Sequence, residues 1–332
     1  MPLWPIDHAC LAVLTALLVD AAGGDPRWLY HRLSHPVALL GFLIERLDRR
    51  FNRAGDSVRR HLAAGFLTAA ALTLGAALAG AIVRGLTTPF EFGWLVEGVL
   101  ASSLLAFRGL YDHVRAVGIA LGENLQSARE AAGRIVGRDT ASLDRTGVAR
   151  AGVESLAENF SDGLVAPVFW YLVLGLPGLC AYKTINTLDS MLGHRTVRHE
   201  HFGKAAARLD DAANWLPARL AGVLLVAAAA LVPGTSGRTA WRAMWRDAPR
   251  HRSVNAGWQE APVAGALGIA LAGPRRYAGR EVPDAWMGAP GSDPASTVAR
   301  PVGVEEIHAA LRLYLTASIA LAGLTLAVCL VH

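Results

Sequence analysis

Two long apolar runs free of charged residues constrain the fold more than any other feature of this sequence. Residues 62–83 and 313–332 each match the about 20 apolar residues needed to cross a bilayer core. Shorter or interrupted apolar runs occupy residues 9–19, 92–107, 164–182 and 220–232. Because lipid offers no hydrogen-bond partner to the backbone, spanning segments of this kind form helices. The sequence therefore predicts an all-α, polytopic membrane bundle of about four to six spans, with residues 1–332 forming one integral-membrane domain.

The composition supports a membrane protein. Hydrophobic residues make up 53% of the chain and charged residues 18%, against about 25% charged in soluble domains. This balance excludes a disordered or fibrous chain, and we expect no nucleic-acid partner. Only Lys183 and Lys204 among the 32 basic residues are lysines. Arginine suits an anionic substrate or lipid headgroups, although an arginine-rich genome explains the bias equally well.

The arginines also predict sidedness, since short cytoplasmic loops carry an excess of positive charge. Six arginines precede the run at 62–83, and Arg84 is the only base between it and the next run; the six are Arg46, Arg49, Arg50, Arg53, Arg59 and Arg60. We therefore expect residues 23–61 at the cytoplasmic face, and residues 108–160 as amphipathic helices there. The expected location is the inner cell membrane, crossed several times, with the active site facing the cytoplasm.

Several segments depart from plain spanning helices. Gly175, Pro177 and Gly178 break the run at 164–182, which either enters and leaves on one side or crosses as a broken helix. Residues 261–272 are too short to span and predict a buried or re-entrant helix. Residues 274–304 are rich in proline and glycine and predict a loop, as a candidate lid or a disordered segment.

The three cysteines lie far apart in apolar runs, at Cys10, Cys180 and Cys329. No CxxC pair and no partnering histidine accompanies them. The sequence therefore predicts neither a disulfide framework nor a zinc site.

Polar residues gather at the edges of the apolar runs. Arg150, Glu154, Glu158 and Asp162 recur every four residues, so a helix would place them on one face. Such a stripe usually forms a solvated, salt-bridged surface. At a membrane entrance, however, its acids with Asn159 suit a hard cation such as Mg²⁺.

Two further clusters follow the broken run. Asn186 and Asp189 share a helical face, with Lys183 one turn before them, and burial between membrane segments favours a functional role. Asp210 and Asn214 stand one turn apart, whereas neighbouring Asp211 equally well begins the next helix as an acidic cap.

Other polar residues carry weaker signals. Residues 251–260 form a fourth cluster, which contains Asn255. Asp25 is typical of a helix N-cap, whereas Asp20 ends an apolar run without an adjacent partner. The histidines at 194, 199 and 201, beside Arg195 and Arg198, predict an anion-facing basic patch rather than a metal site.

The sequence lacks the common nucleotide and nucleophile motifs GxxxxGK[ST], HExxH, GxSxG and GxGxxG. Several longer motifs, in one order between about residues 20 and 277, nevertheless resemble those of the CobD/CbiB family of cobalamin biosynthesis. They are Gly24-Asp25-Pro26, His35-Pro36, residues 136–140 within 129–144, residues 153–159, Asp162-Gly163, Ala166-Pro167, residues 186–190, residues 207–211 and Asn255-Ala256-Gly257.

The resemblance implies an adenosylcobinamide-phosphate synthase, which is a carbon–nitrogen ligase. Family members join the propionate carboxyl of adenosylcobyric acid to the amine of aminopropanol phosphate, or of aminopropanol, with ATP as the energy source. Mg²⁺ would assist by neutralising phosphate oxygens, since a carboxylate is a poor electrophile and requires activation. The implied partners are these substrates, membrane lipid and other corrinoid-pathway enzymes.

Roles follow for the polar residues under this resemblance. The candidate metal ligands are Glu154, Glu158, Asp162 and Asp189. The candidate catalytic residues are Asp210, as acceptor of the amine proton, with Asp189 and Glu158. The candidates for binding substrate or phosphate are Asn159, Asn186, Asn214, Asn255, Arg138, Arg150, Arg208 and Lys183.

Two alternative functions fit parts of the pattern. An intramembrane, Mg²⁺-dependent prenyl or phosphoalcohol transferase also gathers Asp and Asn at the membrane, but Asp162-Gly163 is not followed by Ala-Arg. A cation-coupled transporter could use Glu97 and the acidic stripe. Transporters of that kind often have two similar halves with matching broken helices, and only one broken run is found here.

Overall fold

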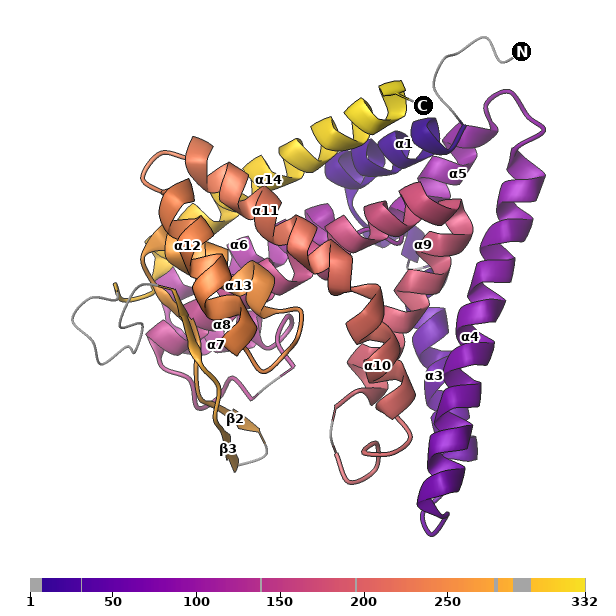
Figure 1. The fold of residues 1–332 in the computed structure, drawn as a ribbon, viewed down its shortest axis with the longest axis horizontal. Helices are drawn as coiled ribbons and strands as arrows, with labels where there is room; N and C mark the ends of the chain where they lie inside the picture. The colour runs from indigo at the N-terminus through magenta and orange to yellow at the C-terminus, as the bar shows by residue number, and fades with distance from the viewer. Residues whose placement is uncertain are drawn as a thin grey trace. The chain divides into compact units, whose positions relative to one another are not determined.

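A computed structural model describes residues 8–331, apart from positions 31, 138, 195, 278–279 and 289–299. The described chain is helical, with strands of three residues each, which confirms the all-α prediction (Figure 1). It divides into two compact units. The first comprises Met1–Arg108, Ala166–Asn214 and Thr325–His332, and the second comprises Gly109–Val165 and Trp215–Leu324.

The predicted multi-pass character is confirmed. Four helical segments are long and apolar enough to cross a membrane: Val58–Thr87, Gly93–Glu123, Arg145–Leu192 and Val304–Val331. A fifth arises if Lys204–Ala213 and Trp215–Leu231 count together as one broken span. The first and last of the four contain the two uncharged runs on which the prediction rested.

The first unit is built around the long helix α4 (Val58–Thr87). This helix packs along α9 (Ala166–Leu192), and α10 (Lys204–Ala213) packs on both (Figure 1). The unit also contains α1 (His8–Gly23), α2 (Arg27–Tyr30), α3 (Pro36–Phe51) and α5 (Gly93–Ser102), with α1 lying against α5. Apolar side chains from α3, α4, α9, α10 and the residue Phe202 before α10 form a core, namely Ile44, Ala69, Leu188, Leu192, Phe202 and Ala206.

Helix α9 is broken where the sequence predicts. Gly175 has φ of 67° and ψ of −159°, a combination that glycine adopts far more readily than other residues, and Pro177 removes a backbone donor two residues later. The break allows the polar second half of α9, from Lys183 to Asp189, to continue in a direction different from that of its apolar first half.

The second unit collects the remaining helices, apart from the first two residues of α6 and the part of α14 after Leu324, which belong to the first unit. They are α6 (Phe107–Glu123), α7 (Leu125–Ala132), α8 (Arg145–Phe160), a π-helical turn (Ser161–Val165), α11 (Trp215–Leu231), α12 (Gly237–Asp247), a 3₁₀ turn (Ala248–Arg250), α13 (Gly257–Leu267) and α14 (Val304–Val331). Helix α13 is buried at ten of its positions, Gly257 and Gln259–Leu267, which confirms a buried helix in the first part of residues 261–272. The prediction is wrong for residues 270–272, which form a strand.

Helix α8 differs from the amphipathic helix predicted within residues 108–160. Helices α6 and α7 each bury one apolar face, whereas α8 is buried almost all round, from Val148 to Ala157 with the exception of Arg150. Its small residues Ala149, Ala151 and Gly152 allow this close packing, which the charge pattern concealed.

The proline- and glycine-rich segment is not simply a loop. Strand β1 (Ala270–Ala272) pairs antiparallel with β4 (Trp286–Gly288), and β2 (Arg275–Tyr277) pairs with β3 (Arg280–Val282). The prediction of a loop over residues 274–304 is therefore wrong at β2, β3 and β4, because backbone pairing holds these strands and side chains of α12 also bond β4. Residues 289–299 of the candidate lid lie outside the described residues.

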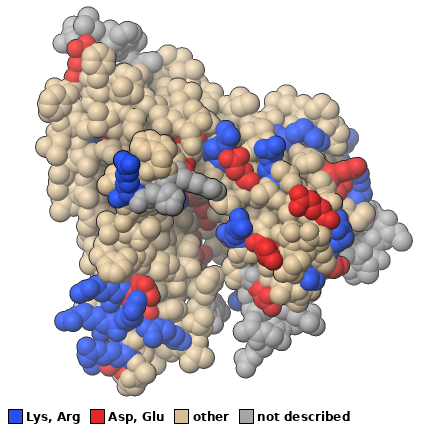
Figure 2. Space-filling view, turned by 180° about the vertical axis from the view of Figure 1, so that it is seen from behind, with Lys and Arg blue, Asp and Glu red and all other residues tan. Residues whose placement is uncertain are grey.

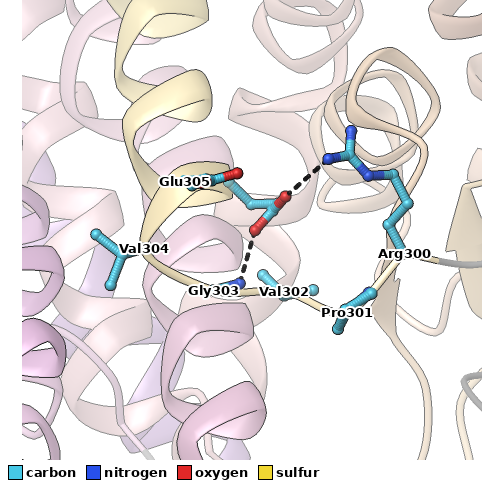
Figure 3. Close-up of a pocket in the computed structure, with 7 residues that line it drawn as sticks. Arg300, Pro301, Val302, Gly303, Val304 and Glu305 are labelled. Carbon is cyan, nitrogen blue, oxygen red and sulfur yellow. Dashed lines mark hydrogen bonds and ion pairs between the residues drawn. The ribbon is translucent and has the colours of Figure 1, made fainter.

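Helix α14 begins with a local capping arrangement (Figure 3). The Glu306 carboxylate accepts a hydrogen bond from Gly303 N at 2.9 Å and lies 3.6 Å from the Arg300 guanidinium. A pocket of about 340 Å³ is lined by residues 300–306. An acid bonded to a free N–H at a helix start stabilises the helix, so this pocket has a structural explanation.

The cysteine prediction is wrong for one pair. Cys10 in α1 and Cys329 in α14 form a disulfide across a sequence separation of 319 residues. Sequence distance says little about such a pair, because the tertiary fold brings the two chain ends together. Cys180 is a free cysteine.

Candidate functional site

In the first unit, α9 and α10 bring together the second and third polar clusters of the sequence. Asn186 Nδ2 on α9 donates to Asp210 Oδ1 on α10 at 3.4 Å. The Asp210 carboxylate also interacts electrostatically with that of Asp189. The i, i+3 spacing places Asn186 and Asp189 on one face of α9, against which α10 packs. The predicted grouping of these residues is thus observed, although no sequence pattern specified which helix meets which.

Asn214, directly after α10, completes this group. Its Oδ1 accepts a hydrogen bond from the Tyr182 hydroxyl at 2.8 Å, and the residue is only 1% exposed. Trp170 fixes the preceding turn, since its indole N–H donates to Ala213 O at 3.0 Å. Among the described residues, Asn214 Nδ2 makes no hydrogen bond of normal geometry, although the side chain lies beside Asp210. A buried amide therefore lies against the acid group and interacts with it.

The basic candidates of this unit differ in exposure. Lys183 is half-buried on α9, one turn before Asn186, and its positive charge interacts with the Asp20 carboxylate. Arg208 is exposed on α10. Asp20, which had no assigned partner, accepts a hydrogen bond from Phe107 N at 2.7 Å and so caps the start of α6.

In the second unit, the first two members of the predicted stripe hold strand β1. Arg150 Nε donates to Ala270 O at 3.1 Å, and its guanidinium lies 4.9 Å from the centre of the Trp286 ring. The buried Glu154 carboxylate accepts from Ala272 N at 2.9 Å. Both side chains are therefore already hydrogen-bonded to backbone groups of β1.

The remaining members of the stripe differ in their surroundings. Glu158 is exposed, and Asn159 Nδ2 donates to Ser155 O at 2.9 Å within its own helix. Asp162 lies in the π-helical turn that follows α8. The metal-binding role of Glu158 and Asp162 stays a prediction.

Asn255 belongs to an aromatic–arginine arrangement of the second unit. Its Oδ1 accepts from Arg219 Nη1 at 2.9 Å, and the Arg219 guanidinium lies 4.6 Å from the ring centres of both Trp215 and Trp258. Stacking between two indoles holds this arginine rigidly. The sequence pattern indicated Asn255 but not Arg219, because Trp215 and Trp258, between which Arg219 stacks, are 43 residues apart in the chain.

The fourth cluster contains a buried histidine between two acids. His251 Nε2 lies 3.7 Å from Glu260 Oε1 and 3.6 Å from Asp284 Oδ2, and all three side chains are almost fully buried. The sequence indicated His251 and Glu260, but Asp284 comes from the segment predicted to be a loop.

Part of the predicted basic patch faces a carboxylate of the protein itself. Asp48 binds the Arg198 guanidinium at 2.7 Å, lies 3.3 Å from His199 Nε2, and accepts from Asn52 Nδ2 at 2.8 Å. Burial alone would raise the pKa of Asp48, but these partners outweigh burial and lower it below the ordinary 3.8. Arg198 and His199 therefore face an anion as predicted, but that anion is a side chain of the protein itself, while Arg195 lies outside the described residues.

The described residues set limits on a metal or phosphate site. No group of three or more His, Cys, Asp or Glu side chains among them converges closely enough to hold a metal ion. Mg²⁺ usually binds through one or two carboxylates together with substrate phosphates. The Asp189–Asp210 pair with its amide neighbours fits that requirement. Arg138 lies outside the described residues.

Along most of its length the chain is similar to proteins of one family. The model of the CobD/CbiB family matches residues 13–314. The chain is 46% identical over 322 residues to the cobalamin biosynthesis protein CobD of Brucella suis, covering 95% of each chain. It is 46% identical over 321 residues to the protein of the same name from Rhodobacter capsulatus, with 96% of each covered. The protein of that name from Sinorhizobium sp. is 43% identical over 328 residues. No solved structure matches. The family match and these relatives together show that the chain belongs to the CobD/CbiB family.

Proposed function

We propose that this protein acts in cobalamin biosynthesis as an adenosylcobinamide-phosphate synthase. In this reaction the propionate carboxyl of adenosylcobyric acid forms an amide with the amine of aminopropanol phosphate or aminopropanol. The observation that carries the proposal is the family match over residues 13–314, with curated relatives named for cobalamin biosynthesis along 95% of the chain.

The polar group on α9 and α10 supports amide formation. An ammonium ion must lose a proton before its nitrogen can attack a carboxyl carbon. Asp210, beside Asp189 and bonded to Asn186, is the proposed acceptor of that proton. Asn186 and Asn214 offer amide groups that would orient the substrates, and the Nδ2 of Asn214 is buried beside the acids.

ATP and Mg²⁺ would supply activation of the carboxyl group, which is otherwise a poor electrophile. Asp189 is the proposed ligand for a phosphate-bound Mg²⁺, since its carboxylate lies close enough to Asp210 to interact with it electrostatically. Glu158, Asp162, Asn159, Asn255, Arg138, Arg150 and Arg208 stay candidates for metal, substrate or phosphate binding. Glu154 is a weaker candidate than these, because Ala272 N already binds its carboxylate.

We place the protein in the inner cell membrane with its arginine-rich end in the cytoplasm. Exposed arginines gather where α3 ends and α4 begins, seen as the blue group at the lower left of Figure 2; they are Arg46, Arg49, Arg50, Arg53, Arg59 and Arg60. Positive charge beside a span favours the cytoplasmic side and its anionic lipid surface.

The contacts of Glu97 weigh against the transporter alternative. This carboxylate is fully buried, and it accepts hydrogen bonds from the Tyr171 hydroxyl and from Thr87 Oγ1 at 3.2 Å, while His8 Nε2 lies 3.1 Å away. A residue that conducts cations needs oxygen atoms free to exchange partners, whereas both oxygens of Glu97 bind other helices.

The test is amide formation by the purified, membrane-reconstituted protein. Adenosylcobyric acid, aminopropanol phosphate, ATP and Mg²⁺ are supplied together, and the product is identified by its mass. Parallel reactions omit ATP, Mg²⁺ or the amine, and aminopropanol replaces its phosphate in a further one. We expect product only in complete reactions. Absence of product from folded protein would contradict the proposed function.

A further inference from the structure

The first unit contains a pocket that none of the assignments above explains. It has a volume of about 440 Å³, within the range of small-molecule sites. Its polar lining consists of Asp25, His35, Ser103 and Lys183, and its apolar lining includes Val37 and Leu105. Asp25 is typical of a helix N-cap in the sequence, and the side chain of His35 caps α3, yet both residues line the same pocket as Lys183 of α9.

Hydrogen bonds fix the orientation of the histidine and the acid. His35 Nδ1 accepts from Val37 N at 3.2 Å, so the ring proton of the neutral histidine is on Nε2. That Nε2 lies 3.2 Å from Asp25 Oδ1 and donates to it. The Tyr30 ring packs on the imidazole with centroids 4.5 Å apart. Asp25 is therefore a positioned carboxylate that remains half-exposed to an incoming ligand.

The charges in this pocket have both signs. Lys183 supplies a positive charge, and Asp25 supplies a negative one. Asp20 adds a second carboxylate that interacts electrostatically with both. Burial raises the pKa of Asp20 to about 6, and the residue is committed to the cap of α6. A ligand with two charges of one sign fits such a lining poorly, whereas a short molecule with a cationic and an anionic end fits it well.

We propose that this pocket binds an aminoalkyl phosphate, with the ammonium group at Asp25 and the phosphate at Lys183. Val37 and Leu105 would contact the short alkyl chain. As the site of the amine substrate, the pocket rests on the proposed function. Lys183 and Asn186 share a face of α9 and are about 4.5 Å apart along its axis, so the proposed phosphate contact lies one turn from the proposed reaction centre.

Binding measurements on the full-length protein in lipid nanodiscs test the pocket without turnover. The nanodiscs contain phosphatidylglycerol only, and the ligands are aminopropanol phosphate, aminopropanol and propyl phosphate. We expect the wild-type protein to bind the zwitterion at least about tenfold more tightly than either truncated ligand, since each charged contact contributes that much. Equal binding of all three ligands would overturn the proposal without any variant.

Three variants assign the two contacts. Lys183→Gln should lose the preference for aminopropanol phosphate over aminopropanol, and Asp25→Asn should lose the preference over propyl phosphate. Lys204→Gln is the matched control, because Lys204 is the other lysine of the chain and is exposed on α10. Its binding should equal that of the wild type. Unchanged ligand preferences in Lys183→Gln and Asp25→Asn would contradict the assignment.

Two further experiments are needed. The first distinguishes a free ligand from a lipid headgroup, and the second distinguishes failure of the pocket proposal from failure of the proposed function. Phosphatidylethanolamine carries an aminoalkyl phosphate headgroup, so nanodiscs containing it should weaken binding of the free ligand only if the lipid also enters the pocket. Either source supports the proposed ligand chemistry. If the binding pattern is observed without amide formation, the pocket stands and the ligase reaction fails. If Lys183→Gln forms amide with an unchanged KM for aminopropanol phosphate, the pocket fails and the reaction stands.

Discussion

At the scale of single residues, two neighbouring acids of α10 have different surroundings. Asp210 is bonded to Asn186 and lies beside Asp189, whereas Asp211 is the adjacent residue and turns to another side of the helix. We expect Asp210→Asn to lower the rate of amide formation about 100-fold or more, as for loss of an acid–base group, and Asp211→Asn to change it less than about threefold. Initial rates measured by mass spectrometry check this prediction. Wild-type turnover in Asp210→Asn would remove Asp210 from the site.

A second residue-scale prediction concerns Asp48 and pH. Its folded-state pKa lies below its ordinary value, so its contribution to stability is fully present above about pH 4 and is lost as the pH falls through the folded value. Asp48→Asn should therefore lower the free energy of unfolding by about 1–3 kcal/mol at neutral pH. The difference from wild type should shrink below about pH 4.

Thermal unfolding of the detergent-solubilised protein between pH 7 and pH 3 measures this difference. Glu45→Gln is the control on the same helix, because its ion pair with Arg49 is exposed and contributes at most about 1 kcal/mol. A difference between wild type and Asp48→Asn that is independent of pH would show that the Asp48 charge is not what stabilises the contact.

At the scale of elements, the break in α9 depends on one glycine. Gly175 has φ of 67°, and a Cβ there would collide with the Arg84 guanidinium. Gly175→Ala should therefore destabilise the protein by at least about 1–3 kcal/mol. Gly75→Ala in α4 should have the opposite sign, stabilising by up to about 1 kcal/mol, because its added methyl meets no atom within 4 Å. Melting temperatures of the two variants, measured in parallel, test whether the break is required.

Elements also show where a local pattern misled the prediction. The apolar run at residues 261–272 predicts one buried helix, but the helix ends at Leu267 and residues 270–272 form strand β1. Arg150 and Glu154, more than 100 residues earlier, hold that strand, so local hydropathy alone could not reveal it. The π-helical turn after α8 could not be predicted either, because hydrogen-bond register at a helix end depends on what packs around it.

At the scale of the whole molecule, α4 predicts the topology of the chain. It has 30 residues, or about 45 Å at 1.5 Å per residue, which is enough to cross the hydrocarbon core. In a background where the three native cysteines are alanine, Ala54→Cys should react with a membrane-impermeant maleimide only from the cytoplasmic side. Glu91→Cys, at the other end of α4, should react only from the opposite side.

Inside-out and right-side-out vesicles supply the two sides. Ala54 and Glu91 are both exposed, so burial does not limit either reaction. Labelling of both positions from one side would contradict a spanning α4. Labelling with the sides exchanged would invert the orientation derived from the arginines.

The sequence by itself determined the helical membrane fold, the position of the long spans, the break near Gly175 and membership of the CobD/CbiB family. Each of these depends on residues close together in the chain or on their order along it. Only the tertiary structure decided that Asn186 meets Asp210, that Cys10 pairs with Cys329, and that Asp25 and His35 share a pocket with Lys183. Local apolar patterns decide what a segment becomes and whether it enters lipid, because those preferences are local free energies. Which segments touch depends on the packing of the whole chain, and that packing turned dispersed polar residues into a candidate site.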